Sequence, residues 1–164
     1  MFKNTIILVC LLVFSGCASK SALSVFDGDK LYEKGLEYSM VGDIINSLET
    51  KAIINATYLN STDSVKYNNE FHNFLVGIYI TEDNKEPKDM FLNNKKYVLT
   101  LNDKEIEKVE ELSTTNYLWE HIPIKNPYAK YYIVSFKKEK NKNSLNLKYE
   151  NINLGKVILS FQGE

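Results

Sequence analysis

The stretch that decides the fold is FLVGIYIT, residues 74–81. Every second side chain in it is a bulky hydrophobic, so that one face of an extended chain carries Phe74, Val76, Ile78 and Ile80. The opposite face carries Leu75, Gly77, Tyr79 and Thr81. A period of two is typical of a β-strand whose sheet buries one face. The stretch therefore predicts a strand packed against a hydrophobic core.

The segment before it can be interpreted in two ways. Alternating apolar residues and a high content of Ile, Thr and Tyr predict a strand over residues 50–59. A helical face is the alternative, since apolar residues also recur every three or four positions, at Val41, Ile45, Leu48, Ala52, Ala56 and Leu59. We predict the strand, because residues 74–81 need a partner. Whether residues 43–60 begin as helix or strand stays open at this point.

More strands are predicted downstream. Residues 95–103, KKYVLTLND, place Tyr97, Leu99 and Leu101 on one face. In residues 104–112, apolar residues three apart leave a short helix and an edge strand as alternatives. Residues 119–128 contain Pro123 and Pro127 and are predicted to form a crossing loop.

The last third of the chain has the clearest pattern. Residues 130–138, KYYIVSFKK, predict one strand, and SLNLKYE (144–150) and KVILSFQ (156–162) predict a hairpin. Six or seven strands without regular helix–strand alternation indicate an all-β fold, an antiparallel β-sandwich in a single domain.

Three of these stretches resemble a known group of proteins. ETKAIINATYLN (49–60), FLVGIYI (74–80) and NPYAKYYIVSF (126–136) are similar to strands of small bacterial lipoproteins that carry a variant immunoglobulin-like domain. The resemblance implies an immunoglobulin-like β-sandwich of about seven strands over residues 31–164, without a cysteine pair between its sheets. It also implies a place at the bacterial surface, but no particular activity.

The N-terminal segment predicts an export signal. Lys3 precedes an apolar run, TIILVCLLVF (5–14), that is too short to span a bilayer. Phe14-Ser15-Gly16-Cys17 then resembles the lipobox of bacterial lipoproteins, although Phe14 stands where that family usually has Leu. The resemblance implies cleavage after residue 16, acylation of Cys17 and, since no Asp follows Cys17, an outer-membrane location. We expect a signal peptide at 1–16 and a lipidated tether at 17–30; plain secretion is the alternative.

Composition and motifs exclude several function classes. The chain has 20 Lys+Arg, all of them Lys, against 21 Asp+Glu, so the basic stripe of a nucleic-acid-binding protein is missing. No nucleotide-binding or nucleophile motif is present. We expect no cofactor and no metal, with His72 at the surface and His121 packed in a loop. No catalytic residue is assigned, and we predict that the protein is not an enzyme.

Tyrosines are the candidate binding residues. Tyr79, Tyr131 and Tyr132 lie on predicted strands, and Tyr and Trp are enriched in protein interfaces. One of the adjacent Tyr131 and Tyr132 is expected to face the core and the other the solvent. We predict a non-catalytic structural or protein-interaction role in the cell envelope, including adhesion, with another envelope or host-surface protein as partner. The alternative is a carrier of a small apolar ligand in the sandwich core.

Overall fold

A computed structural model describes residues 30–62, 65–81, 92–138 and 144–163. The predicted signal peptide, Cys17 and nearly all of the predicted tether lie outside these residues. Residues Leu31–Glu164 form one compact unit. Its elements are α2 (Lys30–Glu37), β1 (Ser39–Asn46), β2 (Glu49–Tyr58), η2 (Leu59–Thr62), η3 (Val65–Tyr67), β3 (Phe71–Ile80), β4 (Tyr97–Leu101), β5 (Lys108–Glu111), η5 (Tyr117–Trp119), β6 (Lys130–Lys137), β7 (Ser144–Asn151) and β8 (Gly155–Gln162).

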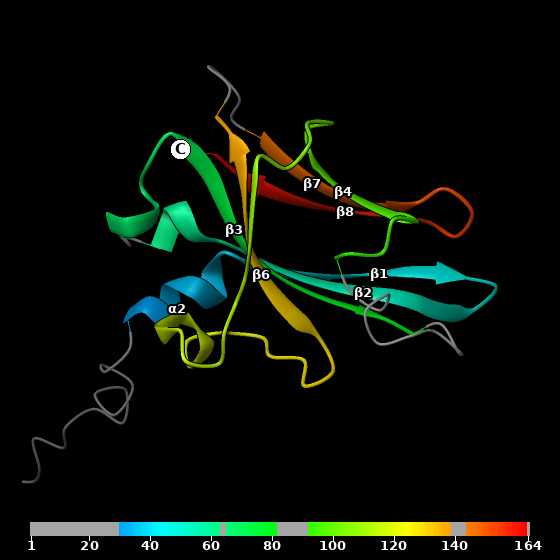
Figure 1. The fold of residues 1–164 in the computed structure, drawn as a ribbon, viewed down its shortest axis with the longest axis horizontal. Helices are drawn as coiled ribbons and strands as arrows, with labels where there is room; N and C mark the ends of the chain where they lie inside the picture. The colour runs from blue at the N-terminus through cyan, green and yellow to red at the C-terminus, as the bar shows by residue number, and fades with distance from the viewer. Residues whose placement is uncertain (1–29, 63–64, 82–91, 139–143, 164) are drawn as a thin grey trace, which may run out of the picture. The chain divides into compact units, whose positions relative to one another are not determined.

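The strands form two antiparallel sheets that lie face to face, as Figure 1 shows. The larger sheet has the order β1-β2-β3-β6-β5, and the smaller has the order β4-β7-β8. On one side the edge strands β1 and β8 come close together. A Cβ atom at Gly42 would lie only 2.4 Å from Cγ2 of Val157, so glycine is required for this approach. The all-β, sandwich-like fold predicted from the sequence is confirmed.

A tight hairpin resolves the ambiguous segment before β3. β1 and β2 are joined by Ser47 and Leu48, whose φ angles of 52° and 66° are those of a two-residue turn between twisted strands. The helical alternative is wrong, because Val41, Ile45 and Leu48 are 46%, 60% and 99% exposed instead of forming a buried stripe. The strand predicted at residues 50–59 is confirmed as β2.

The alternative at residues 104–112 is resolved in favour of the edge strand. β5 pairs only with β6 and all four of its residues are exposed. A short edge strand with three charged side chains in four positions resists pairing with other chains. Its charges therefore protect the edge of the larger sheet.

The main core lies between the two sheets. The predicted inward face of β3 is confirmed, since Phe74, Val76, Ile78 and Ile80 are completely buried. The C-terminal hairpin contributes its predicted face as well, with Leu145, Leu147, Tyr149, Leu159 and Phe161 at 5% exposure or less. Aromatic rings fill the centre, where Phe74 and Phe161 make an edge contact with centroids 5.2 Å apart.

A second apolar cluster covers part of the outer face of the larger sheet. It was not predicted, because the pattern of β3 suggested a sheet with one buried face. Leu75, Tyr131 and Ile133 supply the sheet side, and Leu118 and Ile122 supply the covering side. The helix α2 packs on this cluster through Leu31, and it was not predicted either. The middle of the larger sheet is therefore buried on both faces.

Candidate binding surface

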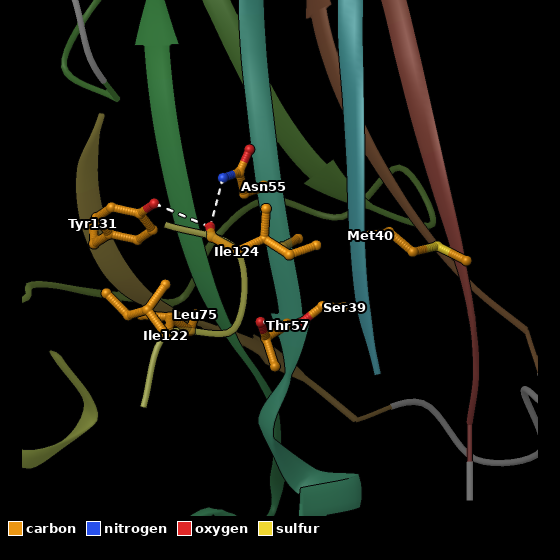
Figure 2. Close-up of a pocket in the computed structure, with 9 residues that line it drawn as sticks. Ser39, Met40, Asn55, Thr57, Leu75, Ile122, Ile124 and Tyr131 are labelled. Carbon is orange, nitrogen blue, oxygen red and sulfur yellow. Dashed lines mark hydrogen bonds between the residues drawn. The ribbon is translucent and has the colours of Figure 1, made fainter. Parts of the chain in front are cut away.

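The enclosed pocket nearest to the predicted tyrosines is very small. It lies between β2, β3 and the crossing loop, and its volume is about 10 Å³ (Figure 2). That is room for a single water molecule, whereas a site for a small organic ligand needs several hundred Å³. The pocket therefore offers no space for a carried ligand.

Polar contacts around this pocket fasten the crossing loop to the sheet. Figure 2 shows the carbonyl oxygen of Ile124 accepting two hydrogen bonds, from Asn55 Nδ2 at 2.8 Å and from the Tyr131 hydroxyl at 3.3 Å. The same Tyr131 hydroxyl accepts a hydrogen bond from the backbone N–H of Asn126 at 2.6 Å. These groups have a structural role, because each is used to hold the loop.

Tyr131 and Tyr132 are both buried, with 2% of each side chain exposed. The expectation that one of them faces solvent is wrong. Tyr132 points into the main core, as predicted for one of the pair, but Tyr131 points into the outer cluster that covers the other face. Burial raises the pKa of both phenols. For Tyr132, the charge of the nearby Glu111 carboxylate raises the pKa further, to about 12. Neither ring is accessible to a partner.

Tyr79 lies where the outer cluster ends. Its side chain is half-buried, and its ring packs against that of Tyr128 from the crossing loop, with centroids 5.7 Å apart. Tyr128 is 70% exposed. Ile53 is the cross-strand partner of Tyr79 and, on its other side, of the exposed Asp43. Val41 and Ile45 flank Asp43 on β1 and are also exposed. We call Tyr79, Tyr128, Ile53, Val41 and Ile45 the Tyr79 patch; Asp43 lies among them.

Most members of the Tyr79 patch were missed in the sequence. Val41 and Ile45 were weighed only as part of a helical face, although their spacing of four residues, an even number, also fits one face of a strand. Tyr128 flanks the predicted crossing loop, but its contact with Tyr79 joins residues 49 positions apart. Such a pairing has no signal in a single sequence.

The outer face of the smaller sheet is different in character. Its side chains form a polar network in which the Ser160 hydroxyl donates a hydrogen bond to Asn146 Oδ1. Nζ of Lys148 lies 2.9 Å from Oδ1 of Asp103 and 3.1 Å from Oε2 of Glu150. Two apolar residues are exposed there, but Ile158 faces Lys148 and Val98 faces Glu150 across the strands. Apolar side chains on this face are thus interspersed with charged ones.

The two histidines lie in different surroundings. His72 is 8% exposed and its Nδ1 lies 2.9 Å from the Tyr58 hydroxyl, so the expectation of a surface position is wrong. His121 is half-buried, and its Nδ1 lies 2.7 Å from the carbonyl oxygen of Tyr117 within the crossing loop. The packing role in a loop that was expected for His121 agrees with this contact.

An open groove at the base of the β6–β7 connection carries mixed charge. It has a volume of about 490 Å³ and is lined by Lys104, Glu105, Ile106, Glu107, Lys137 and Lys138. Because lysines and glutamates alternate around it, the groove does not select for one sign of charge. Within the described residues, no group of three His, Cys, Asp or Glu side chains could hold a metal ion.

No protein-family model matches the chain, and comparison with curated proteins and with solved structures gives no significant match. In the described part of the chain, no helix has the length and apolarity needed to cross a membrane.

Proposed function

We propose that the protein is a lipid-anchored envelope protein whose domain binds another protein through the Tyr79 patch. The main support is the ring contact between Tyr79 and Tyr128, which is 70% exposed, beside exposed apolar residues of β1. Tyrosine offers a large, rigid contact area with a polar tip, and interface hot spots are enriched in it. A cluster of exposed aromatic and apolar side chains is typical of an interaction site.

The strand order supports an immunoglobulin-like domain. In constant-type immunoglobulin domains one sheet has the order A-B-E-D and the other C-F-G. The orders β2-β3-β6-β5 and β4-β7-β8 correspond to these in sequence and in antiparallel pairing, with β1 added at the edge. Val76 on β3 and Leu147 on β7, the strands that correspond to B and F, are buried in the main core. Immunoglobulin-like domains are often found on cell surfaces, which agrees with a binding role.

Core packing favours the interaction role over the carrier alternative. A carrier would need an apolar cavity of several hundred Å³ between the sheets. The space between the sheets is instead occupied by buried side chains, among them Phe74, Phe136 and Phe161. A non-catalytic role also agrees with the absence of a recognisable catalytic motif in the sequence.

The lipid anchor is proposed from the lipobox, Phe14-Ser15-Gly16-Cys17. Acyl chains add about 0.8 kcal/mol per buried CH₂, so several of them fix a protein to the outer membrane. Mass spectrometry of the mature protein should show a diacylglycerol-modified N-terminal Cys17. Cys17→Ala should abolish the modification and move the chain out of the membrane fraction. Normal membrane partition of Cys17→Ala would contradict the anchor.

Photo-crosslinking on intact cells tests the binding surface. A photoreactive residue at Tyr128 should capture a specific partner, and one at Ile152, which is 90% exposed at the β7–β8 turn, serves as the control. With the partner in hand, Tyr79→Ser and Tyr128→Ser should each weaken binding about 30-fold, the equivalent of a hot-spot loss of about 2 kcal/mol. Ile158→Ser, which changes a 48% exposed residue on the other sheet, should leave binding intact. Equal losses at all three positions would contradict the proposal.

A further inference from the structure

The helix α2 carries apolar side chains on two neighbouring sides, about 100° apart around its axis. On one side Leu31 packs on the outer cluster, and Gly35 lies so close to the crossing loop that a Cβ atom there would be 3.0 Å from Cγ of Pro123. On the other side Tyr32 and Leu36 are 39% and 49% exposed. These two are four residues apart and therefore lie on one face of the helix. The domain therefore leaves this part of the apolar stripe of α2 only partly covered.

The same layer of the domain presents aromatic rings together with lysines. Figure 1 shows α2 beside the short helix η5, which begins at Tyr117. Tyr117 is 45% exposed, and Nζ of Lys66 lies 5.5 Å from the centroid of its ring. Nζ of Lys125 lies 4.7 Å from the ring of Trp119 in the same loop. Tyrosine, tryptophan and lysine are the residues that occupy the headgroup region of membranes, with the lysine ammonium kept in water.

Chain length indicates what covers this face. Twelve residues separate Cys17 from Lys30, the first residue of α2. A flexible linker of that length has an r.m.s. span of about 20 Å. A folded domain of this size has a diameter of roughly 35 Å. The anchor therefore holds the α2 side of the domain at a distance from the bilayer that is smaller than the diameter of the domain.

We propose that the exposed face of α2, with Tyr32, Leu36 and the neighbouring Tyr117 and Lys66, rests in the headgroup region of the membrane that holds Cys17. The proposal rests on the lipid anchor proposed above. A short linker produces an effective concentration in the millimolar range, so even a weak intrinsic affinity of this face for lipid is sufficient. The outer face of the smaller sheet, in the other layer of the sandwich, is then directed away from the bilayer.

The cysteine content of the mature chain permits a site-specific test. After removal of residues 1–16, Cys17 is the remaining cysteine and is acylated, so Leu36→Cys creates a unique thiol for an environment-sensitive fluorophore. Ile158→Cys, at 48% exposure on the smaller sheet, is the matched control. The full lipidated chain is placed in vesicles of phosphatidylethanolamine and phosphatidylglycerol. The label at residue 36 should show blue-shifted emission and severalfold weaker quenching by iodide than the label at residue 158. Adding Tyr32→Ser and Tyr117→Ser should restore quenching at residue 36.

The outcomes separate this inference from the anchor. Equal quenching at both positions, with acylated Cys17 confirmed by mass spectrometry, would overturn the membrane-facing helix and leave the anchor intact. Loss of the acyl mass would overturn both. Protection of residue 36 that develops only after an envelope protein extract is added would show that α2 faces a protein instead of lipid, and would also overturn the inference.

Discussion

Gly77 of β3 and Tyr131 of β6 are direct cross-strand partners, and the tyrosine ring occupies the space in which a side chain at residue 77 would lie. A Cβ atom at Gly77 would be 2.4 Å from Cε1 of Tyr131. The ring is held in place by hydrogen bonds between its hydroxyl and the crossing loop, one accepted from Asn126 N–H and one donated to Ile124 O, and by an edge contact with Trp119, with centroids 5.8 Å apart. Glycine weakens a strand interior, and an aromatic ring over it restores packing. The pair therefore couples the centre of the sheet to the loop.

We expect Gly77→Ala to destabilise the domain by about 1–3 kcal/mol, because the new methyl group must displace a ring that cannot move freely. Tyr131→Leu removes the ring and should relieve part of this loss. In a double-mutant cycle followed by urea unfolding, the two changes should show a coupling energy of about 0.5–3 kcal/mol. Strictly additive losses would contradict the steric argument.

The two-residue periodicity of the sequence predicted most of the strands. It assigned some side chains to the wrong environment where a second layer of the fold buries the outer face of the sheet. In β3 the alternation of Phe74, Val76, Ile78 and Ile80 is decisive, because a strand has only two faces and these four residues take one of them. The same rule then assigned Leu75 to the solvent face and required either Tyr131 or Tyr132 to face solvent. It failed there because segments distant in sequence, such as that of Leu118 and Ile122, cover this face. A single strand pattern carries no information about such a covering layer.

The candidate binding surface was predicted only at Tyr79. Its partner Tyr128 and its neighbour Val41 come from different parts of the chain, and the β1–β2 register that aligns Val41 with this face depends on the turn at Ser47 and Leu48. His72 was placed at the surface because it follows Glu70 and Phe71 near the start of a predicted strand. In the folded chain its ring packs against Tyr58 instead, with centroids 5.9 Å apart.

One pair of neighbouring residues can test which face of the C-terminal hairpin points into the core. Phe161 is 5% exposed in the main core, whereas Gln162 is exposed. Phe161→Asp should destabilise by more than about 3 kcal/mol, because it removes a buried ring and buries an unpaired carboxylate. Gln162→Asp should change stability by less than about 0.5 kcal/mol. Similar losses for both variants in chemical unfolding would contradict the half-buried hairpin.

Tyr149 offers a substitution that should not destabilise the domain. Its side chain is 1% exposed and its ring stacks on Tyr97 with centroids 5.3 Å apart. Among the described residues, its hydroxyl has no hydrogen-bond partner. Tyr149→Phe keeps the ring and removes a buried polar atom, so stability should be unchanged or higher by about 1 kcal/mol. Tyr58→Phe is the matched control, and it should destabilise by about 1–3 kcal/mol because it removes a hydrogen bond to buried His72. If Tyr149→Phe is the more harmful change, the hydroxyl has an unrecognised role.

Buried tyrosines should make the domain sensitive to alkaline pH. The pKa of Tyr132 is raised to about 12 by burial and by the charge of Glu111, whereas an unfolded tyrosine titrates near 10. Below about pH 10 the phenol is neutral in both states, so its contribution to stability is fully present there. As pH rises from about 10 to about 12, the unfolded chain loses this proton while the folded domain retains it. Stability should therefore fall by about 1.4 kcal/mol per pH unit for this tyrosine.

Tyr132→Phe isolates the contribution of this residue to the pH dependence. Burial also raises the pKa of Tyr67 and Tyr149, so the wild-type domain should lose stability more steeply than a single group predicts. Urea unfolding at about pH 8, 10.5 and 11.5 should show a slope that is smaller in Tyr132→Phe than in the wild type by about 1.4 kcal/mol per pH unit above pH 10. Tyr128→Phe, which changes a 70% exposed phenol, should keep the wild-type slope. If the two variants have the same slope, Tyr132 ionises as readily in the folded domain as in the unfolded chain, and its burial in the main core is incorrect.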